Sequence, residues 1–310
     1  MQPFAYVAIR HAAPAGTASF SAFRSTWGLR QPFAAPAVEE SSIGFPADGH
    51  VDYALIWTGF LASLAAGGMT GVGALPALLP AIRVSPRLQD VMLGFAAGVM
   101  LAASAFSLIV PGLEAAAADY GGELTAALIV GCGILLGAVA LWLVDEYVPH
   151  EHFILGREGV MSTSLRRIWL FVIAITLHNF PEGLAVGVGY GAGDLGRANA
   201  LAIGIGLQNL PEGLAVAVAL ASEGYSRGAA FVVALLTGMV EPVGGLIGVT
   251  AVTLARPLLP WGLAFAAGAM IFVISSEIIP ETHRKGSKIE STFGLMIGFV
   301  VMMILDTTLG

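Results

Sequence analysis

Eight stretches of this chain are apolar and long enough to cross a lipid bilayer as helices. A membrane-spanning helix needs about 20 mostly apolar residues. The chain is 56% hydrophobic and 11% charged, with a mean hydropathy of +0.83, which excludes an ordinary soluble domain. The sequence therefore predicts an all-α, polytopic membrane protein with the lipid bilayer as a partner. Its eight helices are expected at roughly residues 54–80, 88–112, 123–146, 167–190, 198–221, 228–255, 257–279 and 290–308.

The first 50 residues differ from the rest of the chain. They mix Ala, Ser, Pro, Phe and Arg without a sustained apolar run, and they lack the apolar core of a secretory signal. We expect residues 1–50 to be a disordered tail and residues 51–310 to form one eight-helix transmembrane domain. The net charge of −7 argues against a nucleic-acid partner. The single cysteine, Cys132, excludes a disulfide framework and a cysteine metal cluster.

Basic residues between the helices orient the chain, because cytoplasmic loops carry an excess of Lys and Arg. If the N-terminus is outside, the outer loops hold only Arg197 and Arg256. The inner loops then hold Arg83, Arg87, Arg157, Arg166, Arg167, Arg227, Arg284, Lys285 and Lys288. This asymmetry predicts that both termini lie outside and that the 147–166 loop lies in the cytoplasm.

Two sequence patterns occur twice. HNFPEGLAVGVG, from His178, is followed thirty residues later by QNLPEGLAVAVA, from Gln208. LGFAAGVM at Leu93–Met100 returns as LAFAAGAM at Leu263–Met270, at an offset of 170 residues. A sequence with two such pairs is expected to contain an internal structural repeat.

A third, weaker match has the same offset of 170. It pairs Gly68-Met69 with Gly238-Met239, although two-residue matches arise by chance in a sequence rich in Gly and Ala. Together the repeats suggest that helices 1–3 and 6–8 are copies flanking helices 4 and 5. Because the first copy starts outside and the second inside, the copies are inverted. Inverted repeats are common in secondary transporters, with the binding site near the midplane.

Three glutamates lie near the middle of their apolar segments. Glu182, Glu212 and Glu241 each lie about 13–15 residues into a helix, which at 1.5 Å per residue reaches the centre of the membrane. No Lys or Arg lies inside the apolar segments away from their ends. Unpaired buried carboxylates cannot all remain ionised. They must therefore be protonated or bind cations.

The residues beside these glutamates favour a cation. His178 and Glu182 are four residues apart and share a helix face, and Gln208 and Glu212 repeat that spacing. Amide groups stand three residues before each of these two glutamates, at Asn179 and Asn209. One imidazole among carboxylates and amides suits Zn²⁺, Fe²⁺, Mn²⁺ or Cd²⁺, whereas Ca²⁺ and Mg²⁺ would not need the imidazole. Six carboxylate oxygens could bridge two ions.

Proline and glycine flank the same two glutamates. Pro181 and Pro211 each remove a backbone donor and clash with the preceding turn, so we expect the two helices to open there. Gly183 and Gly213 leave room for close approach. Met100 is kept as a candidate thioether ligand beside the more ordinary explanation, which is packing.

Two further polar sets lie towards the ends of the helices. An acidic outer mouth, formed by Glu114, Asp119 and Glu123, would concentrate divalent cations, although three scattered acids can also be coincidence. A second set at the inner ends could receive metal leaving the midplane, although helix caps and solvated loop ends are the ordinary alternative. Its members are Asp90, Asp145, His150, His152, Glu277, Glu281 and His283.

The motifs HNFPEG, QNLPEG, EPVGG and SSEIIPETH (Ser275–His283) resemble those of the ZIP (ZRT/IRT-like protein) family of divalent-metal transporters. The resemblance covers roughly residues 54–310. It implies eight helices arranged three plus two plus three, metal bound between helices 4 and 5, transport towards the cytoplasm, and a homodimer. The proline version of the motif and the short 147–166 loop suggest a prokaryotic member, and hence an inner-membrane protein with periplasmic termini.

Carried over by position, the resemblance implies two adjoining metal sites. The primary site would contain His178, Glu182, Gln208, Glu212 and Glu241. Asn179 and Asn209 would join the three glutamates in the second site. Many members have His where this chain has Gln208, so metal selectivity can differ here.

Import of Zn²⁺ is the function that these observations favour, with Cd²⁺, Fe²⁺ or Mn²⁺ as further cargo and no resident cofactor. A proton-coupled carrier of an organic cation is an alternative, but no aromatic-lined pocket is evident near the motifs. An intramembrane metalloprotease is a second alternative, but it would need an HExxH motif, which the chain lacks. We therefore expect a transporter and not an enzyme.

Overall fold

The computed structural model of the protein describes residues 52–79, 84–147, 150–152, 156–158, 167–222, 224–283 and 288–310. Residues 1–50, expected to be a disordered tail, lie outside the described residues. Within the described part, eight helical spans are long and apolar enough to cross a membrane. The prediction of an all-α polytopic membrane protein is thus confirmed.

The first five spans follow the predicted segments closely, with one exception. The second span continues to Tyr120 instead of ending near residue 112, because Pro111 lies in the first turn of a new helical segment, where proline is tolerated. The elements of the five spans are α2 (Tyr53–Ala74) with η1 (Leu75–Leu78); α3 (Pro86–Ala102), η2 (Ala103–Ile109) and α4 (Val110–Tyr120); α5 (Glu123–Tyr147); α6 (Arg167–Gly191); and α7 (Leu195–Ser222).

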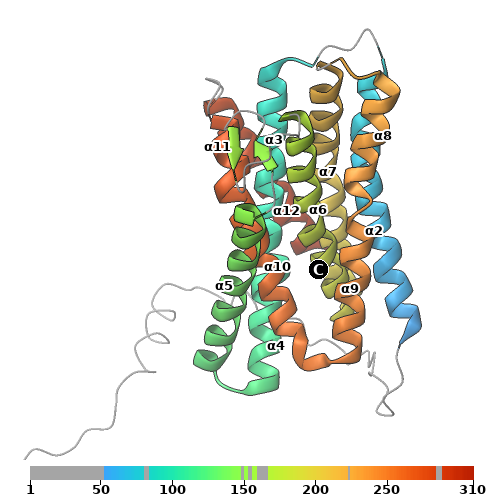
Figure 1. Ribbon diagram of the computed structural model, residues 1–310. Coiled ribbons are helices and arrows are strands. Elements are labelled where there is room, and N and C mark those ends of the chain that lie inside the picture. The colour runs from blue at the N-terminus through green and yellow to red at the C-terminus, as the bar shows by residue number, and fades with distance from the viewer. Residues whose placement is uncertain are drawn as a thin grey trace, which may run out of the picture. The chain divides into compact units, whose positions relative to one another are not determined.

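The last three spans contain two interrupted helices and one continuous helix. They consist of α8 (Arg227–Gly238) and α9 (Glu241–Leu254); η3 (Arg256–Leu258), α10 (Leu259–Val273), η4 (Ile274–Ile278) and α11 (Ile279–His283); and α12 (Lys288–Leu309). A small antiparallel hairpin of β1 (His150–His152) and β2 (Gly156–Glu158) lies between α5 and α6. We call the end of the helices beside this hairpin the hairpin end (Figure 1). The other end, where Gly121 and Gly122 adopt positive φ angles between α4 and α5, is the glycine-turn end.

The prolines of the two motifs do not open their helices, contrary to the sequence-based expectation. Helices α6 and α7 run through Pro181 and Pro211 without a break. A proline removes one backbone donor, but neighbouring helices keep a transmembrane helix intact around it. The interruption lies in the sixth span, where Met239 and Val240 separate α8 from α9 directly before Glu241.

Helix packing reveals the internal repeat. The four most extensive helix contacts are α3 with α12, α5 with α10, α6 with α9, and α2 with α7. In the predicted repeat, span one corresponds to span six, two to seven and three to eight, and α6 corresponds to α7. Under this correspondence the α3–α12 contact is equivalent to the α10–α5 contact. The α6–α9 contact is likewise equivalent to the α7–α2 contact. The π-helical segments η2 and η4 correspond under the same exchange. This pattern supports the predicted repeat of helices 1–3 and 6–8 around helices 4 and 5.

Glycines fix the register of the repeat. A Cβ on Gly67 would lie 2.2 Å from the carbonyl oxygen of Gly238, and a Cβ on Gly238 would lie 2.3 Å from that of Gly67. The first and sixth spans therefore correspond at an offset of 171, one residue more than the Gly68-Met69 match predicts.

The second and seventh spans keep the predicted offset of 170. A Cβ on Gly298 of α12 would lie 2.0 Å from the carbonyl oxygen of Phe95, and one on Gly137 of α5 would lie 2.0 Å from that of Phe265. Phe95 and Phe265 are 170 residues apart. The same contacts relate α5 to α12, since Gly137 corresponds to Gly298.

Candidate functional site

The two motif copies place their polar side chains inside the protein. Three- and four-residue spacing puts the side chains of each copy on one helix face, and α6 and α7 contact each other. Each of these residues is at most 7% exposed, and so is Glu241. The buried set is His178, Asn179, Glu182, Gln208, Asn209, Glu212 and Glu241.

Hydrogen bonds join four helices at this level. The Gln208 side-chain amide donates to Glu182 Oε2 over 2.6 Å and to Asn209 Oδ1 over 2.7 Å. The Asn209 amide donates to Glu241 Oε1 over 2.6 Å and to the carbonyl oxygen of Ala66 over 2.8 Å. The structure therefore connects Glu182 on α6 with Glu241 on α9 through two α7 amides, and ties them to α2.

Several buried oxygens at this site lack a hydrogen-bond partner among the described residues. They are Asn179 Oδ1, Glu182 Oε1, Gln208 Oε1, Glu212 Oε2 and Glu241 Oε2. Buried polar atoms almost always have partners, so such a cluster requires an explanation. Carboxylate and amide oxygens are ligands for a divalent cation.

The side chains are not yet arranged around a cation. No three His, Cys, Asp or Glu side chains within the described ranges are grouped closely enough to hold a metal ion. The amide groups stand between the glutamates and present N–H donors to them. Holding a cation would therefore require these amides to turn.

His178 contacts a glutamate that belongs to neither copy of the motif. Its Nε2 lies 2.7 Å from Glu277 Oε2 in η4. The sequence predicts His178 beside Glu182 as a ligand, but its pairing with Glu277 was not predicted. Gln208, the corresponding residue on α7, donates to Glu182, so the first side chains of the two motif copies have different hydrogen-bond and ion-pair partners.

A cavity of about 270 Å³ reaches His178 from the hairpin end. Its wall includes Asp90, Glu277 and Glu281, which the sequence places in one inner set. Asp145, another member, lines a small adjoining space with His178 and Glu277. The backbones of His150, His152 and His283 belong to β1 and α11, whereas their side chains lie outside the described part of the protein.

Comparison with known proteins identifies the family. The family profile described as "ZIP Zinc transporter" matches residues 150–306. The chain is 49% identical to the zinc transporter GufA of Myxococcus xanthus, over 81% of this chain and 99% of that protein. It is 50% identical to the zinc transporter ZIPB of Bordetella bronchiseptica, over 84% of this chain and 82% of the relative. It is also 38% identical to human zinc transporter ZIP11, over 72% and 89% of the two chains.

The chain belongs to the ZIP family. The resemblance drawn from HNFPEG, QNLPEG, EPVGG and SSEIIPETH is therefore confirmed. ZIP proteins are transporters, so the expectation that the chain is not an enzyme is also confirmed and the metalloprotease alternative falls. Bacterial relatives at about half identity support the prediction of a prokaryotic member.

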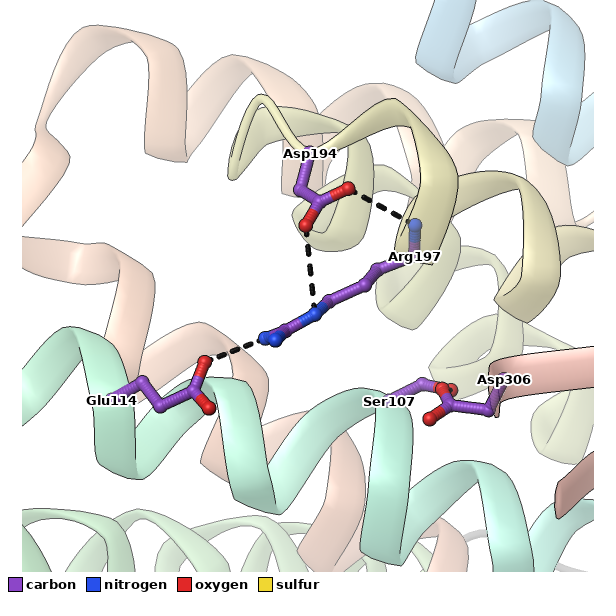
Figure 2. Close-up of polar contacts among 5 residues, drawn as sticks. All are labelled: Ser107, Glu114, Asp194, Arg197 and Asp306. Carbon is purple, nitrogen blue, oxygen red and sulfur yellow. Dashed lines mark hydrogen bonds and ion pairs between the residues drawn. The ribbon is translucent and has the colours of Figure 1, made fainter. Parts of the chain in front are cut away.

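At the glycine-turn end of this ZIP-family chain, polar side chains contact one another across helices. Arg197 lies on α7, and its Nη1 is 2.6 Å from Glu114 Oε2 on α4. Its Nε is 3.5 Å from Oδ2 of Asp194, which precedes α7 (Figure 2). Ser107 of η2 donates to Asp306 of α12 over 2.7 Å. The sequence suggested an acidic mouth of Glu114, Asp119 and Glu123 in this region. Arg197, 83 residues from Glu114 in the chain, neutralises part of it.

Met100 lies among apolar side chains. It is 1% exposed and belongs to the main buried cluster, together with Leu201, Ile205 and Met270. Leu201 and Ile205 lie on α7 between Arg197 and Gln208. Apolar packing therefore separates the ZIP-family motif residues from the polar contacts of the glycine-turn end, and a ligand role for Met100 stays a prediction.

Proposed function

We propose that the protein imports Zn²⁺ through a site formed by α6, α7 and α9. The observation that carries this proposal is the cluster of buried carboxylate and amide oxygens that have no partner in the described part of the chain. A cation would stabilise these atoms, which otherwise remain desolvated without compensation. One imidazole among oxygen ligands suits Zn²⁺. The names of the relatives, which are zinc transporters, support the same cargo.

Ligand exchange would begin with the amides. Gln208 donates its N–H to Glu182, while its own Oε1 has no partner among the described residues. A cation bound by Glu182 would repel the N–H dipole, so the amide would turn and offer Oε1 to the ion. Asn209, which donates to Glu241, would respond in the same way. The proposed ligand set is therefore His178, Asn179, Glu182, Gln208, Asn209, Glu212 and Glu241, for one ion or two adjoining ions.

Cd²⁺, Fe²⁺ and Mn²⁺ are proposed as further cargo, because a mixed nitrogen and oxygen set binds them too. We also propose that transport occurs by alternating access. The cavity at the hairpin end reaches His178, whereas a cavity of about 180 Å³ at the glycine-turn end reaches Leu201 and Leu263 of the apolar cluster but not His178. This difference matches a state in which the site is accessible from the hairpin end. A homodimer is carried over from the family resemblance.

The hairpin end is proposed to face the cytoplasm of a bacterial cell. Among the basic loop residues that the structure describes, Arg157, Arg227 and Lys288 belong to this end, and cytoplasmic loops carry an excess of such residues. Metal would then leave past His178, Glu277 and Asp90 into the cytoplasm, and both termini would be periplasmic. In a Cys132→Ala background, Gly310→Cys should react with a membrane-impermeant maleimide added outside the inner membrane; protection of Gly310→Cys until the membrane is opened would reverse the orientation.

Metal uptake into proteoliposomes tests the function. Zn²⁺ is added outside and a fluorescent chelator is enclosed. Wild type should fill the vesicles, whereas Glu182→Ala/Glu212→Ala should not. Glu146→Ala/Glu290→Ala is the matched control, because it removes two exposed acids and should leave uptake unchanged.

Three results would contradict the proposal. Uptake by Glu182→Ala/Glu212→Ala at the wild-type rate would remove the site from α6 and α7. A folded wild type that moves no Zn²⁺, Fe²⁺ or Mn²⁺ would favour the organic-cation carrier. Because the ligands must be deprotonated to bind metal, uptake should weaken as the pH is lowered, and uptake that is insensitive to acid would argue against carboxylate and imidazole ligands.

A further inference from the structure

Thr70 on α2 is a buried hydroxyl with an unusual environment. It is 0% exposed, and its Oγ1 has no hydrogen-bond partner among the described residues. Threonine and serine in transmembrane helices normally donate to the carbonyl four residues earlier. Ser63, Thr176 and Thr253 do so here, each over 2.7 Å. For Thr70 that carbonyl belongs to Ala66, which already accepts from the Asn209 amide.

The internal repeat gives Thr70 a counterpart at the transport site. The first and sixth spans correspond at an offset of 171, so Thr70 corresponds to Glu241. The contacts agree: a Cβ on Gly213 would lie 1.8 Å from the Thr70 carbonyl oxygen, and a Cβ on Gly183 would lie 2.0 Å from that of Glu241. Thr70 therefore contacts the α7 motif in the way that Glu241 contacts the α6 motif.

The repeat also gives Thr70 a counterpart of the amide that bonds Glu241. Glu241 accepts from Asn209, and the residue that corresponds to Asn209 is Asn179. Both amide atoms of Asn179 are buried, and neither has a partner in the described part of the chain. A threonine hydroxyl extends two atoms less far from the backbone than a glutamate carboxylate. By this correspondence, a third group would join the Asn179 amide to the Thr70 hydroxyl, which lies beside Gly238, where Asn209 and Glu241 meet directly.

We propose that Thr70 is part of the transport site and that its hydroxyl, together with the Asn179 amide, binds an oxygen of the cation's hydration shell. This inference rests on the proposed function. The cation would then contact carboxylates on the Glu241 side and a retained water on the Thr70 side. Because Thr70 is neutral where its counterpart Glu241 is a carboxylate, the total negative charge around the cation is lower. The cation is then held less tightly, which favours its release into the cavity at the hairpin end.

Binding of Zn²⁺ to the purified full-length protein in detergent, measured by titration calorimetry, tests the inference. Thr70→Val keeps the shape of the side chain and removes the hydroxyl, and it should raise the Kd for Zn²⁺ about tenfold, the loss typical of a group that supports metal ligands. Thr70→Ser should restore binding close to wild type. Thr253→Val is the matched control, because its hydroxyl only returns to its own helix. Thermal unfolding checks each variant, and Thr70→Ala replaces Thr70→Val if the latter does not fold.

A double-mutant cycle separates this role from a structural one. If Thr70 and Asn179 hold the same oxygen, Thr70→Val/Asn179→Ala should bind Zn²⁺ no worse than Asn179→Ala alone. Wild-type affinity in Thr70→Val, or fully additive losses in the double variant, would overturn the inference while leaving the proposed function intact. Zn²⁺ binding by Glu182→Ala/Glu212→Ala at the wild-type affinity would overturn both.

Discussion

The two copies of the motif, one on α6 and one on α7, are alike in their packing and different in their polar contacts. Gly183 of α6 contacts the backbone of Glu241, and Gly213 of α7 contacts the backbone of Thr70 in the same way. The first residue of each copy behaves differently: His178 pairs with Glu277 beside the hairpin-end cavity, whereas Gln208 contacts Glu182 inside the site. The repeat thus preserves the backbone packing, and the difference between His178 and Gln208 gives each copy its own polar contacts.

This difference suggests how one scaffold would serve both binding and release at the proposed site. The α7 copy holds Glu182 and Glu241 together through Gln208 and Asn209. The α6 copy connects the same level to the cavity through His178. A metal ion moving from Glu182 towards Glu277 would therefore pass from one copy's contacts to the other's. Substitutions at matching positions of the two copies test which of their contacts are equivalent and which differ.

The largest effect is expected where the copies are equal. A Cβ on Gly183 or Gly213 would lie 2.0 Å or 1.8 Å from a backbone carbonyl oxygen, and overpacking of this kind costs about 3 kcal/mol. Gly183→Ala and Gly213→Ala should both lower the midpoint of thermal unfolding and abolish uptake. Gly68→Ala and Gly131→Ala are the controls, because a Cβ there meets nothing within 4 Å. If only one of the two motif glycines tolerates alanine, the packing of the copies is not equivalent.

Sequence reasoning was most successful where one local property decides the structure. Length and hydropathy predicted the eight spans because a membrane demands apolar helices. The second span was predicted to end near residue 112, but α4 runs through Pro111 to Tyr120. The register of the first and sixth spans differs by one residue from the prediction, because the Gly67–Gly238 contact depends on packing between helices.

For the candidate site, the sequence supplied the side chains but not their pairing. Seven buried polar residues were named from their spacing, their depth in the apolar segments and the family resemblance, and their roles as ligands remain predictions. The pairs that matter between spans join residues far apart in the chain, such as His178 with Glu277 and Arg197 with Glu114. Such contacts depend on how the helices pack against one another, and the periodicity of a single helix does not predict that packing.

Exchanging the first residues of the two copies should alter metal preference. His178→Gln removes the one imidazole at the site, so we expect Zn²⁺ binding to weaken at least about tenfold, with a smaller loss for Mn²⁺, which prefers oxygen. Gln208→His adds an imidazole beside Glu182 and should tighten Zn²⁺ binding relative to Mn²⁺. Calorimetric titration of both ions gives the ratio. Equal losses for both metals in His178→Gln would mean that His178 shapes the site without binding the ion.

A smaller effect is expected from the contact that distinguishes the α6 copy. Glu277→Gln keeps a hydrogen-bonding group beside His178 but removes its charge, so a cation would leave the site less readily. We expect the maximal uptake rate to fall a few-fold, while the Kd for Zn²⁺ changes little. Glu290→Gln, an exposed acid on α12 at the same end, should change neither quantity. A large rise in Kd with an unchanged maximal rate would make Glu277 part of the binding site instead.

The smallest effect is expected at the glycine-turn end, where α7 is tied to α4. The Arg197 and Glu114 side chains are 37% and 56% exposed, and an exposed ion pair contributes less than about 1 kcal/mol. Glu114→Gln weakens this tie, so it should raise uptake slightly, by less than about fivefold and most clearly at low ionic strength. Asp119→Asn removes the same charge from the same end without breaking an ion pair, and should not raise uptake.

The direction of that small change separates two roles for Glu114. If the Glu114 carboxylate mainly holds Arg197, its loss frees α7 from α4 and uptake increases. If it mainly attracts divalent cations, as the acidic pattern of Glu114, Asp119 and Glu123 suggests, its loss lowers the local cation concentration. Uptake at low Zn²⁺ would then fall in Glu114→Gln and Asp119→Asn alike. A fall in both variants would therefore make this end a cation-concentrating surface, and the ion pair would be incidental to transport.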